Sequence, residues 1–339
     1  MLHRARSLTI ALFLGCAIVL VPVAARGVAT GGFPVVDLRV AVADAPLGDE
    51  APPGAALHQA SALALRKGRV AGVVLPLREP RRGVPSDPPL ESAFLSMDRW
   101  LARPDDFASP GCLTSSERIE TWFAFRGAAE LGAEPAKTGL WTLRGVRAFG
   151  LTSGEDNSLA TSWTNGAALV GLTDQGRGVA RRVFQSGGLL DVGESSDATR
   201  DDVFQLASQF HAPVVALSAN ARALADDPRN LSDAELYSIG ASGGVVGIGF
   251  DEHLVVRGHT AGIHDVVRHI QHVAKISGID HVAIASGFGT GIRPADGLED
   301  ASKFPDLARA LLASGFTDDA VNRIFFKNAL RVLCSSSRH

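Results

Sequence analysis

Cysteine is scarce in this chain, with only Cys16, Cys112 and Cys334. Two cysteines far apart cannot build a structural zinc site alone. If the segment that carries Cys16 is removed on export, Cys112 and Cys334 remain, and an oxidising compartment lets them pair where the fold brings them together. Two unpaired buried thiols are the equally weighted alternative.

An excess of either charge is also missing. The formal net charge is -3, with 20% charged and 46% hydrophobic residues in 339. This balance gives no electrostatic reason to expect nucleic acid as a partner. The length and apolar content predict one large α/β domain without extended disorder.

Several short catalytic and binding motifs are absent. No Gly-x-Gly-x-x-Gly turn follows an early strand, and no His-Glu-x-x-His pair occurs. No Gly-x-Ser-x-Gly elbow or Ser/His/Asp set can be read with useful spacing. The Gly287–Gly291 loop lacks the Gly-Lys-Ser/Thr ending of a phosphate cradle, so we expect it to turn the chain. Dinucleotide binding and serine hydrolysis are therefore disfavoured.

The N-terminus has the pattern of a signal peptide. His3, Arg4 and Arg6 precede an apolar run over 8–23, which small residues at 24–25 follow. The run is short for a membrane span, so residues 1–26 are predicted to be a cleaved signal, with a retained anchor as the alternative. A lipoprotein reading of Cys16 is weaker, because most of the apolar stretch follows the cysteine. We expect an exported protein that is periplasmic, extracellular or anchored to the membrane.

From residue 33 onward, short apolar runs alternate with helical stretches. The runs are apolar on both faces, as strands buried in a parallel sheet must be. Eight strands separated by helices predict a (β/α)8 TIM-like barrel as a single domain over 33–335, with an open doubly wound sheet as the alternative. The predicted strands are 34–37, 70–77, 120–125, 145–151, 188–192, 213–217, 244–250 and 281–285. The Pro-rich, charged run at 79–89 is predicted to be a loop.

Capping residues mark the start and end of one helix. Ser232 and Glu235 form a capping box, Leu231 and Leu236 are placed for a hydrophobic staple, and Gly243 is placed to end the helix.

A second helix has Val266, Ile270, Val273 and Ala274 on one face and ends at Gly278. Its three histidines, His264, His269 and His272, are expected to be solvated, and His211 and His281 to be structural.

Catalytic groups of such a barrel follow the carboxyl ends of the strands. A zinc pair there needs neutral imidazoles and bridging carboxylates. Among the residues that follow the strands, only Glu194 is a plausible metal ligand, and one carboxylate does not hold a catalytic zinc. The residues at these positions are Arg39, Ala41, Arg126, Ser153, Glu194, Ser218 and Gly287.

Two long runs resemble the membrane (renal) dipeptidase family of zinc peptidases. They are ANARALADDPRNLSDAELYSIGASGGVVGIGF from Ala219 and HDVVRHIQHVAKISGIDHVAIASGFGTG from His264, with weaker similarity from Leu151, Gly171 and Ile324. The resemblance implies a barrel of the metal-dependent hydrolase type, two zinc ions, dipeptide substrates and a homodimer.

The resemblance also implies that the metal ligands are replaced here. The family's Asp-Gly-His-Asn-Asp corresponds to Asp37–Ala41, so Arg39 and Ala41 replace two ligands. Arg126 stands for the bridging glutamate, and Ser153 for the histidine of Leu-Thr-His that faces the substrate. Glu194 ends the counterpart of Asp-Leu-Ser-His, Ser218 stands for the histidine of Ser-His-Ser-Asn, and Gly287 for the aspartate of Gly-Ser-Asp-Phe.

Some family residues are retained. Arg229 matches the arginine that contacts the substrate carboxylate, and Asn157, Asp191 and Asn220 are retained as structural residues. We therefore expect no metal cofactor, and a cluster in which Arg126, together with Arg39, neutralises Glu194. The alternative is an arginine that points to solvent at the rim.

Three functions are consistent with this sequence. The first is an exported, inactive dipeptidase-like barrel that binds a small carboxylate-bearing ligand or a protein partner at its former active-site face through Arg229. The second is an active peptidase or amidohydrolase with an atypical metal arrangement or none. The third is a structural module of a cell-envelope assembly.

Overall fold

The computed structural model describes residues 32–41, 58–78, 95, 107–109, 111–112, 118–166 and 169–335. The chain divides into two units, 1–31 and 32–339, and every described residue belongs to the second. The predicted signal or anchor at 1–26 and the predicted loop at 79–89 lie outside the described residues. Within the described ranges, no helix has the length and apolar character needed to cross a bilayer.

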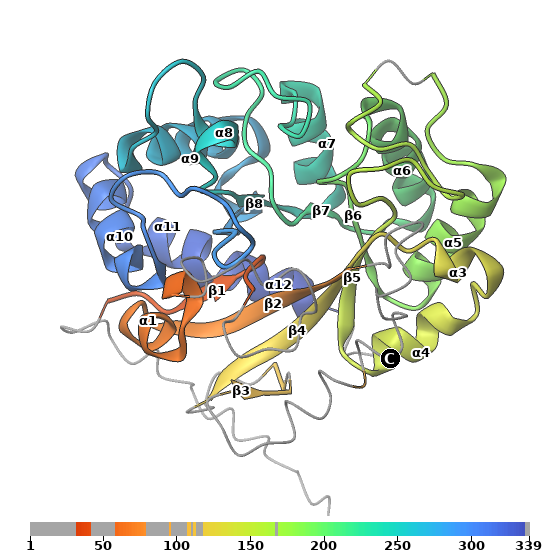
Figure 1. Ribbon diagram of the computed structural model, residues 1–339, viewed down its shortest axis with the longest axis horizontal. Helices are drawn as coiled ribbons and strands as arrows, with labels where there is room; N and C mark the ends of the chain where they lie inside the picture. Colours follow the sequence, from red (N-terminus) through yellow and green to blue (C-terminus); the bar gives the residue numbers. More distant parts are fainter. Residues whose placement is uncertain are drawn as a thin grey trace, which may run out of the picture. The chain divides into compact units, whose positions relative to one another are not determined.

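Eight parallel strands form a closed barrel (Figure 1). Their order is β2-β1-β9-β8-β7-β6-β5-β4, and a seven-residue pairing between β2 and β4 closes the ring. The strands are β1 Val35–Asp37, β2 Val70–Arg78, β4 Ile119–Arg126, β5 Val146–Gly150, β6 Leu189–Asp191, β7 Val214–Ala216, β8 Val245–Ile248 and β9 Val282–Ile284. All eight predicted strands are confirmed. The sequence analysis missed β3 (Phe107–Ala108), which pairs with the first residues of β4.

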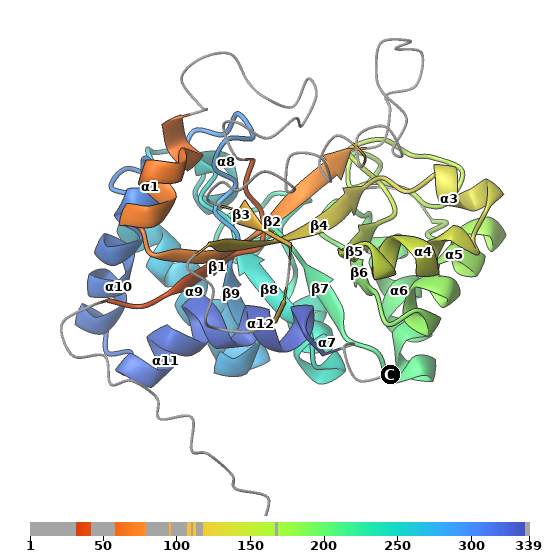
Figure 2. The same ribbon diagram turned by 90° about the horizontal axis from the view of Figure 1, so that it is seen from below.

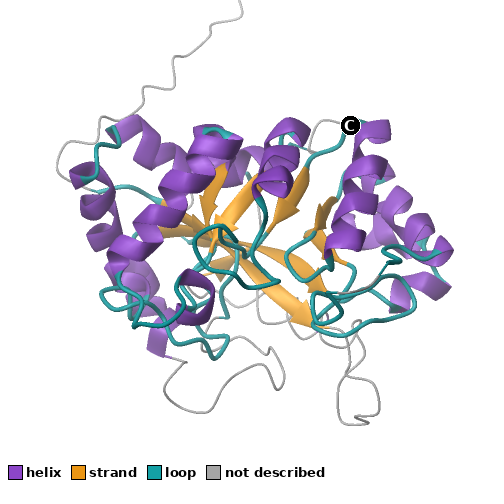
Figure 3. Cartoon of the chain, turned by 90° about the horizontal axis from the view of Figure 1, so that it is seen from above, coloured by secondary structure: helices purple, strands orange, loops and turns teal. Residues whose placement is uncertain are grey.

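Helices surround the strands (Figure 3). The α-helices are α1 Ala62–Lys67, α3 Glu130–Ala133, α4 Lys137–Leu143, α5 Asp174–Gln185, α6 Asp197–Phe210, α7 Asp233–Ser242, α8 Glu252–Val255, α9 Ile263–Ser277, α10 Phe304–Ala313, α11 Asp318–Asn322 and α12 Asn328–Leu333. The described residues also include the 3-10 helices η3 Ile279–His281 and η4 Ala301–Lys303 and the π-helix η5 Arg323–Lys327.

Side chains alternate between two cores along each strand, because successive residues point to opposite faces. Val36, Val74 and Trp122 fill the barrel interior, while Val35, Val73 and Phe123 pack toward the surrounding helices. The interior core ends at α12, whose apolar residues are part of it. Figure 2 shows α12 running beneath the strands. The barrel is therefore packed rather than hollow, and its opposite end is left for a binding cleft.

The capping box of α7 is confirmed. The Glu235 N–H donates to the Ser232 hydroxyl at 3.4 Å, and the Ser232 N–H donates to the Glu235 carboxylate at 2.7 Å. Gly243 ends the helix with a φ of +81°, which suits glycine because it has no Cβ.

The expectation for the α9 histidines is wrong for His269. His269 is only 1% exposed, because it shares the buried face with Val266 and Val273, three and four residues away. Its Nδ1 accepts the Ala221 N–H at 3.1 Å, and its Nε2 donates to the Val255 carbonyl at 2.7 Å. Burial lowers the pKa of His269 to about 4, so the ring is neutral at pH 7.

Cys112 and Cys334 form a disulfide with a Cα–Cα distance of 5.8 Å, which settles the alternative left open by the sequence. Cys334 directly follows α12, and the guanidinium of Arg147 at the start of β5 donates to the Leu333 carbonyl at 2.8 Å. These contacts hold α12 against the barrel.

Candidate functional site

An open cleft of about 610 Å³ lies at the carboxyl ends of the strands. Seven of the eight residues singled out from the sequence line it: Arg39, Arg126, Ser153, Glu194, Ser218, Arg229 and Gly287. Ala41 does not line the cleft, because it is buried with its N–H donating to the Phe288 carbonyl at 2.8 Å. The parallel barrel brings these residues together since all its strands end at this face.

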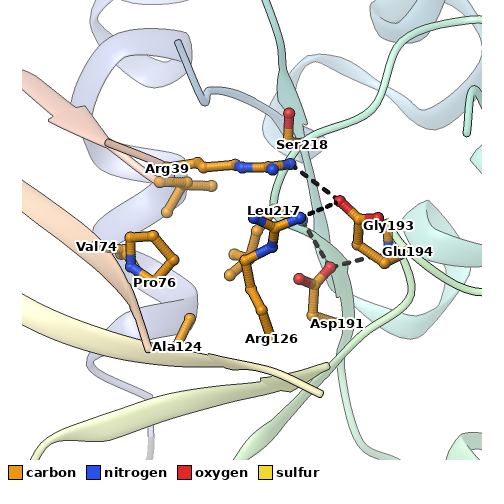
Figure 4. A pocket seen from close by; sticks show the side chains of 11 residues that line it. Arg39, Val74, Pro76, Ala124, Arg126, Asp191, Gly193, Glu194, Leu217 and Ser218 are labelled. Carbon is orange, nitrogen blue, oxygen red and sulfur yellow. Dashed lines mark hydrogen bonds and ion pairs between the residues drawn. The ribbon is translucent and has the colours of Figure 1, made fainter. Parts of the chain in front are cut away.

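Two arginines converge on one glutamate in the cleft floor (Figure 4). Arg126 ends β4, and its Nη2 lies 2.9 Å from Oε1 of Glu194, in the loop after β6. Arg39 follows β1, and its Nη1 lies 3.4 Å from the same oxygen. The expected Arg/Glu cluster is therefore formed, and neither arginine points away to solvent.

The remaining carboxylate oxygen of Glu194 is bound by a residue that the sequence analysis missed. The indole N–H of Trp163 donates to Oε2 at 2.9 Å. The Thr152 hydroxyl donates to the backbone carbonyl of Glu194 at 2.7 Å, which fixes the loop. The available signal for Trp163 was an isolated aromatic residue in the polar segment after β5.

The electrostatics of the cluster favour a charged Glu194. Burial alone would raise the pKa of Glu194, but the charges of Arg126 and Arg39 and the Trp163 hydrogen bond outweigh it and hold the pKa at about 2. Arg229 contributes in the same direction. Glu194 is therefore ionised at any physiological pH.

A small cavity of about 20 Å³ borders the cluster. Arg39, Arg126 and Glu194 line it together with apolar side chains such as Val74 and Leu217 (Figure 4). The cluster thus separates the apolar barrel interior from the cleft.

Arg229 reaches the cleft from the loop after β7. Its guanidinium binds both carboxylate oxygens of Asp227, at 3.1 and 3.3 Å, and lies 3.9 Å from Asp251. The guanidinium carbon also lies 5.1 Å from the ring centroid of Trp163, in cation–π geometry. Trp163 therefore contacts both Glu194 and Arg229.

A buried arginine on α6 fixes the loop that carries Arg229. Arg200 is fully buried and donates to the carbonyls of Pro228 and Arg229 at 3.1 and 3.3 Å. It also donates to the Val192 carbonyl at 3.3 Å and to Glu235 at 3.2 Å. Arg200 thereby ties the loop of Glu194 to the loop of Arg229, and no sequence pattern indicated this.

Two further carboxylates near the barrel mouth accept hydrogen bonds from backbone N–H groups. Asp191 accepts the N–H groups of Leu217 and Gly193 at 2.9 and 3.0 Å, and burial raises its pKa. Asp37 accepts the Ser286 N–H and hydroxyl at 2.9 and 2.5 Å, and burial raises its pKa to about 7.

Two asparagines near the cleft, Asn157 and Asn220, hold loops and do not line it. Asn157 accepts the Leu159 and Ala160 N–H groups, and Asn220 bonds both the N–H and the carbonyl of Gly249. In the loop after β9, the Gly287 N–H donates to the Arg39 carbonyl at 2.9 Å. Gly287 has a φ of +78°, so a larger residue would strain this turn.

The donor atoms of the mouth are mostly cationic or hydroxylic. Across the described part of the chain, no group of three or more His, Cys, Asp or Glu side chains is arranged to hold a metal ion. What the mouth offers instead is guanidinium and hydroxyl donors, which suit acidic and hydrogen-bond-accepting ligands.

Comparisons with known proteins identify relatives. A family model described as "Membrane dipeptidase (Peptidase family M19)" matches residues 111–337. An uncharacterized protein in the pqqA 5' region of Klebsiella pneumoniae is 35% identical over 167 residues, which is 48% of this chain and 60% of the relative. Dipeptidase verJ of Clonostachys rogersoniana is 30% identical over 221 residues, or 65% of this chain and 56% of the relative. The chain thus spans little more than half the length of these relatives.

Solved structures share the fold. The probable dipeptidase PvdM from Pseudomonas aeruginosa has a TM-score of 0.77 at 22% identity, covering 90% of this chain and 96% of that one. A metallo peptidase from Rhodobacter sphaeroides, liganded with a phosphinate mimic of the dipeptide L-Ala-D-Ala, has a TM-score of 0.75 at 21% identity, covering 90% and 100%. Since the family model covers two thirds of the chain, the protein belongs to the membrane dipeptidase family.

Proposed function

We propose that this protein is an exported member of the membrane dipeptidase family that binds a small carboxylate-bearing ligand at the barrel mouth and does not cleave it through a zinc pair. The observation that carries the proposal is the convergence of Arg39 and Arg126 on Glu194. These residues occupy the strand ends where the family resemblance places metal ligands.

The side chains present do not fit a zinc pair. Glu194 is bound by two guanidinium groups, and Asp37 and Asp191 are bound by backbone N–H groups. Asp251, which also lines the cleft, lies 3.9 Å from the Arg229 guanidinium. A divalent cation about 4 Å from either arginine would be repelled by about 8 kcal/mol at an effective dielectric constant near 20. Zinc sites also need imidazole nitrogens, thiolate sulfurs or several free carboxylates as ligands.

The same groups favour an acidic ligand. Arg229 lines the cleft at the position that corresponds to the substrate-binding arginine of the family. Its Nε and Nη2 bind Asp227, so its Nη1 is the donor that we propose for a ligand carboxylate. The Rhodobacter sphaeroides relative in this fold holds a dipeptide mimic. A ligand of dipeptide size with a free carboxylate is therefore our proposal for this cleft.

Export is supported by the disulfide. Disulfides persist in oxidising compartments and are rare in the cytosol, and Cys112–Cys334 joins the connection between β3 and β4 to the end of α12. The N-terminal pattern of basic, apolar and small residues agrees with this proposal.

Binding and hydrolysis are tested with one ligand series. Dipeptides and the same dipeptides as C-terminal amides are added to the folded protein, and the melting temperature is measured. We expect the free acids, and not the amides, to raise it, because a ligand of the native state stabilises that state. Arg229→Gln should abolish the shift. Arg257→Gln is the matched control, since Arg257 also binds Asp227, at 2.8 Å, but does not line the cleft.

Two outcomes would refute the proposal. Zinc-dependent hydrolysis of the dipeptides would favour the active peptidase. An unchanged melting temperature across the series would favour a structural module.

A further inference from the structure

Arg229 enters the cleft with one edge of its guanidinium already bound. Its Nε and Nη2 bind the two carboxylate oxygens of Asp227, at 3.1 and 3.3 Å. The Trp163 ring lies against the guanidinium, with the ring centroid 5.1 Å from the guanidinium carbon. Asp227 is buried and also binds Arg257 at 2.8 Å, so this anchor is fixed. Nη1 is therefore the donor that Arg229 presents to a ligand.

A carboxylate stands beside that donor. Asp251 lines the same cleft and is the N-cap of α8, where its Oδ1 accepts the His253 N–H at 3.2 Å. Its Oδ2 lies 3.9 Å from Nη1 of Arg229, which is an ion-pair distance but longer than a hydrogen bond. The side chains of Arg229 and Asp251 are 26% and 16% exposed. Both groups therefore keep hydrogen-bonding capacity for a ligand in the cleft.

The charges around Arg229 and Asp251 are balanced, with three arginines in ion pairs with three carboxylates. The pairs are Arg229 with Asp227 and Asp251, Arg257 with Asp227, and Arg293 with Glu252. A ligand that brings only a carboxylate to Arg229 adds a negative charge next to Asp251, and like charges at this distance repel. A ligand that also brings an ammonium group offsets that charge, because the ammonium binds Asp251. The balance thus favours a zwitterionic group over a simple anion.

We propose that Arg229 and Asp251 together bind an α-amino acid head group, with its carboxylate on Nη1 of Arg229 and its ammonium on Oδ2 of Asp251. One carbon carries both charges of such a group, which suits a donor and an acceptor that are 3.9 Å apart. The inference rests on the proposed function, whose carboxylate it keeps on Arg229, and it adds the ammonium as a second recognised group. The cleft of about 610 Å³ has room for a chain attached to that carbon.

The way in which a dipeptide is joined decides whether it can make both contacts. In an ordinary dipeptide, the ammonium and the terminal carboxylate belong to different residues, with the peptide bond between them. A dipeptide joined through the side chain of its first residue keeps both groups on one carbon. We therefore expect γ-glutamylalanine to bind both Arg229 and Asp251. Its isomer α-glutamylalanine carries the same charges but should bind through a carboxylate alone.

The test is calorimetric titration with these two isomers. We expect the wild-type protein to bind γ-glutamylalanine about ten-fold more tightly than α-glutamylalanine, because only the γ isomer brings its ammonium to Asp251 together with a carboxylate on Arg229. N-acetylation of the γ isomer removes the ammonium charge without any change in the protein, and should reduce its affinity to that of the α isomer. Asp251→Asn should have the same effect on the γ isomer and leave binding of the α isomer unchanged.

The variant and its control are matched in charge and position. Asparagine is as good an N-cap as aspartate, so Asp251→Asn keeps the start of α8. Glu252→Gln removes a negative charge from the next residue, which pairs with Arg293 and does not line the cleft, and should keep the preference for the γ isomer.

The outcomes separate this inference from the proposed function. Equal binding of the two isomers by the wild type, or a preference that survives N-acetylation or Asp251→Asn, would overturn the inference and leave carboxylate binding intact. Binding of neither isomer would overturn both this inference and the proposed function.

Discussion

Glu194→Gln should destabilise the fold by an amount that depends on pH. In the folded protein, burial works against the charge of Glu194, but Arg126 and Arg39 prevail and lower its pKa from 4.5 to about 2. This drop corresponds to about 3 kcal/mol of stability when the carboxylate is ionised in both states. The contribution is fully present above the unfolded pKa and is lost as the pH falls from about 4.5 toward 2.

The assay is urea denaturation of wild type and variant at several pH values. At pH 7 the variant should lose about 3 kcal/mol, and the difference should shrink as the pH is lowered below 4. Glu134→Gln is the control, because Glu134 forms an exposed pair with Lys137 and should cost less than about 1 kcal/mol at every pH. A loss at pH 7 no larger than the control, or a large loss that stays constant down to pH 3, would refute the electrostatic reasoning.

Three further predictions concern other parts of the fold. Reducing the Cys112–Cys334 bond, or Cys334→Ser, should lower the free energy of unfolding by about 3 to 5 kcal/mol, because the bridge spans 222 residues; a melting temperature unchanged by reductant would contradict this. Asp37→Asn should remove a decline in stability between about pH 4 and 7, since burial raises the pKa of Asp37 to about 7 and its ionised form is disfavoured in the fold; parallel pH profiles in urea denaturation would count against it. Arg200→Met should cost about 3 to 5 kcal/mol in the same assay, because Glu235 then stays buried without its full partner, and a loss below about 1 kcal/mol would argue otherwise.

Apolar runs and capping residues allowed most of the fold to be predicted from sequence. Buried parallel strands are apolar on both faces, so runs such as 70–77 stand out locally, and the capping box of Ser232 and Glu235 is a short-range pattern. β3 was missed because two residues carry no periodicity.

The candidate site could be predicted only where a residue follows a strand. Arg39, Arg126 and Glu194 were found in this way, and their convergence follows from the geometry of a barrel. Trp163 and Arg200 act through partners that the fold brings from distant parts of the chain. The burial of His269 could have been read from its spacing to Val266 and Val273 on α9, whereas its hydrogen-bond partner Ala221 comes from a distant loop.

The central claim is that an Arg/Glu cluster stands in place of a metal centre, and zinc content tests it most directly. The purified protein is incubated with zinc, dialysed, and analysed by elemental mass spectrometry. We expect well below one zinc ion per chain, since the guanidinium groups of Arg39 and Arg126 repel a divalent cation at Glu194. Retention of about two tightly bound zinc ions per chain would contradict the account.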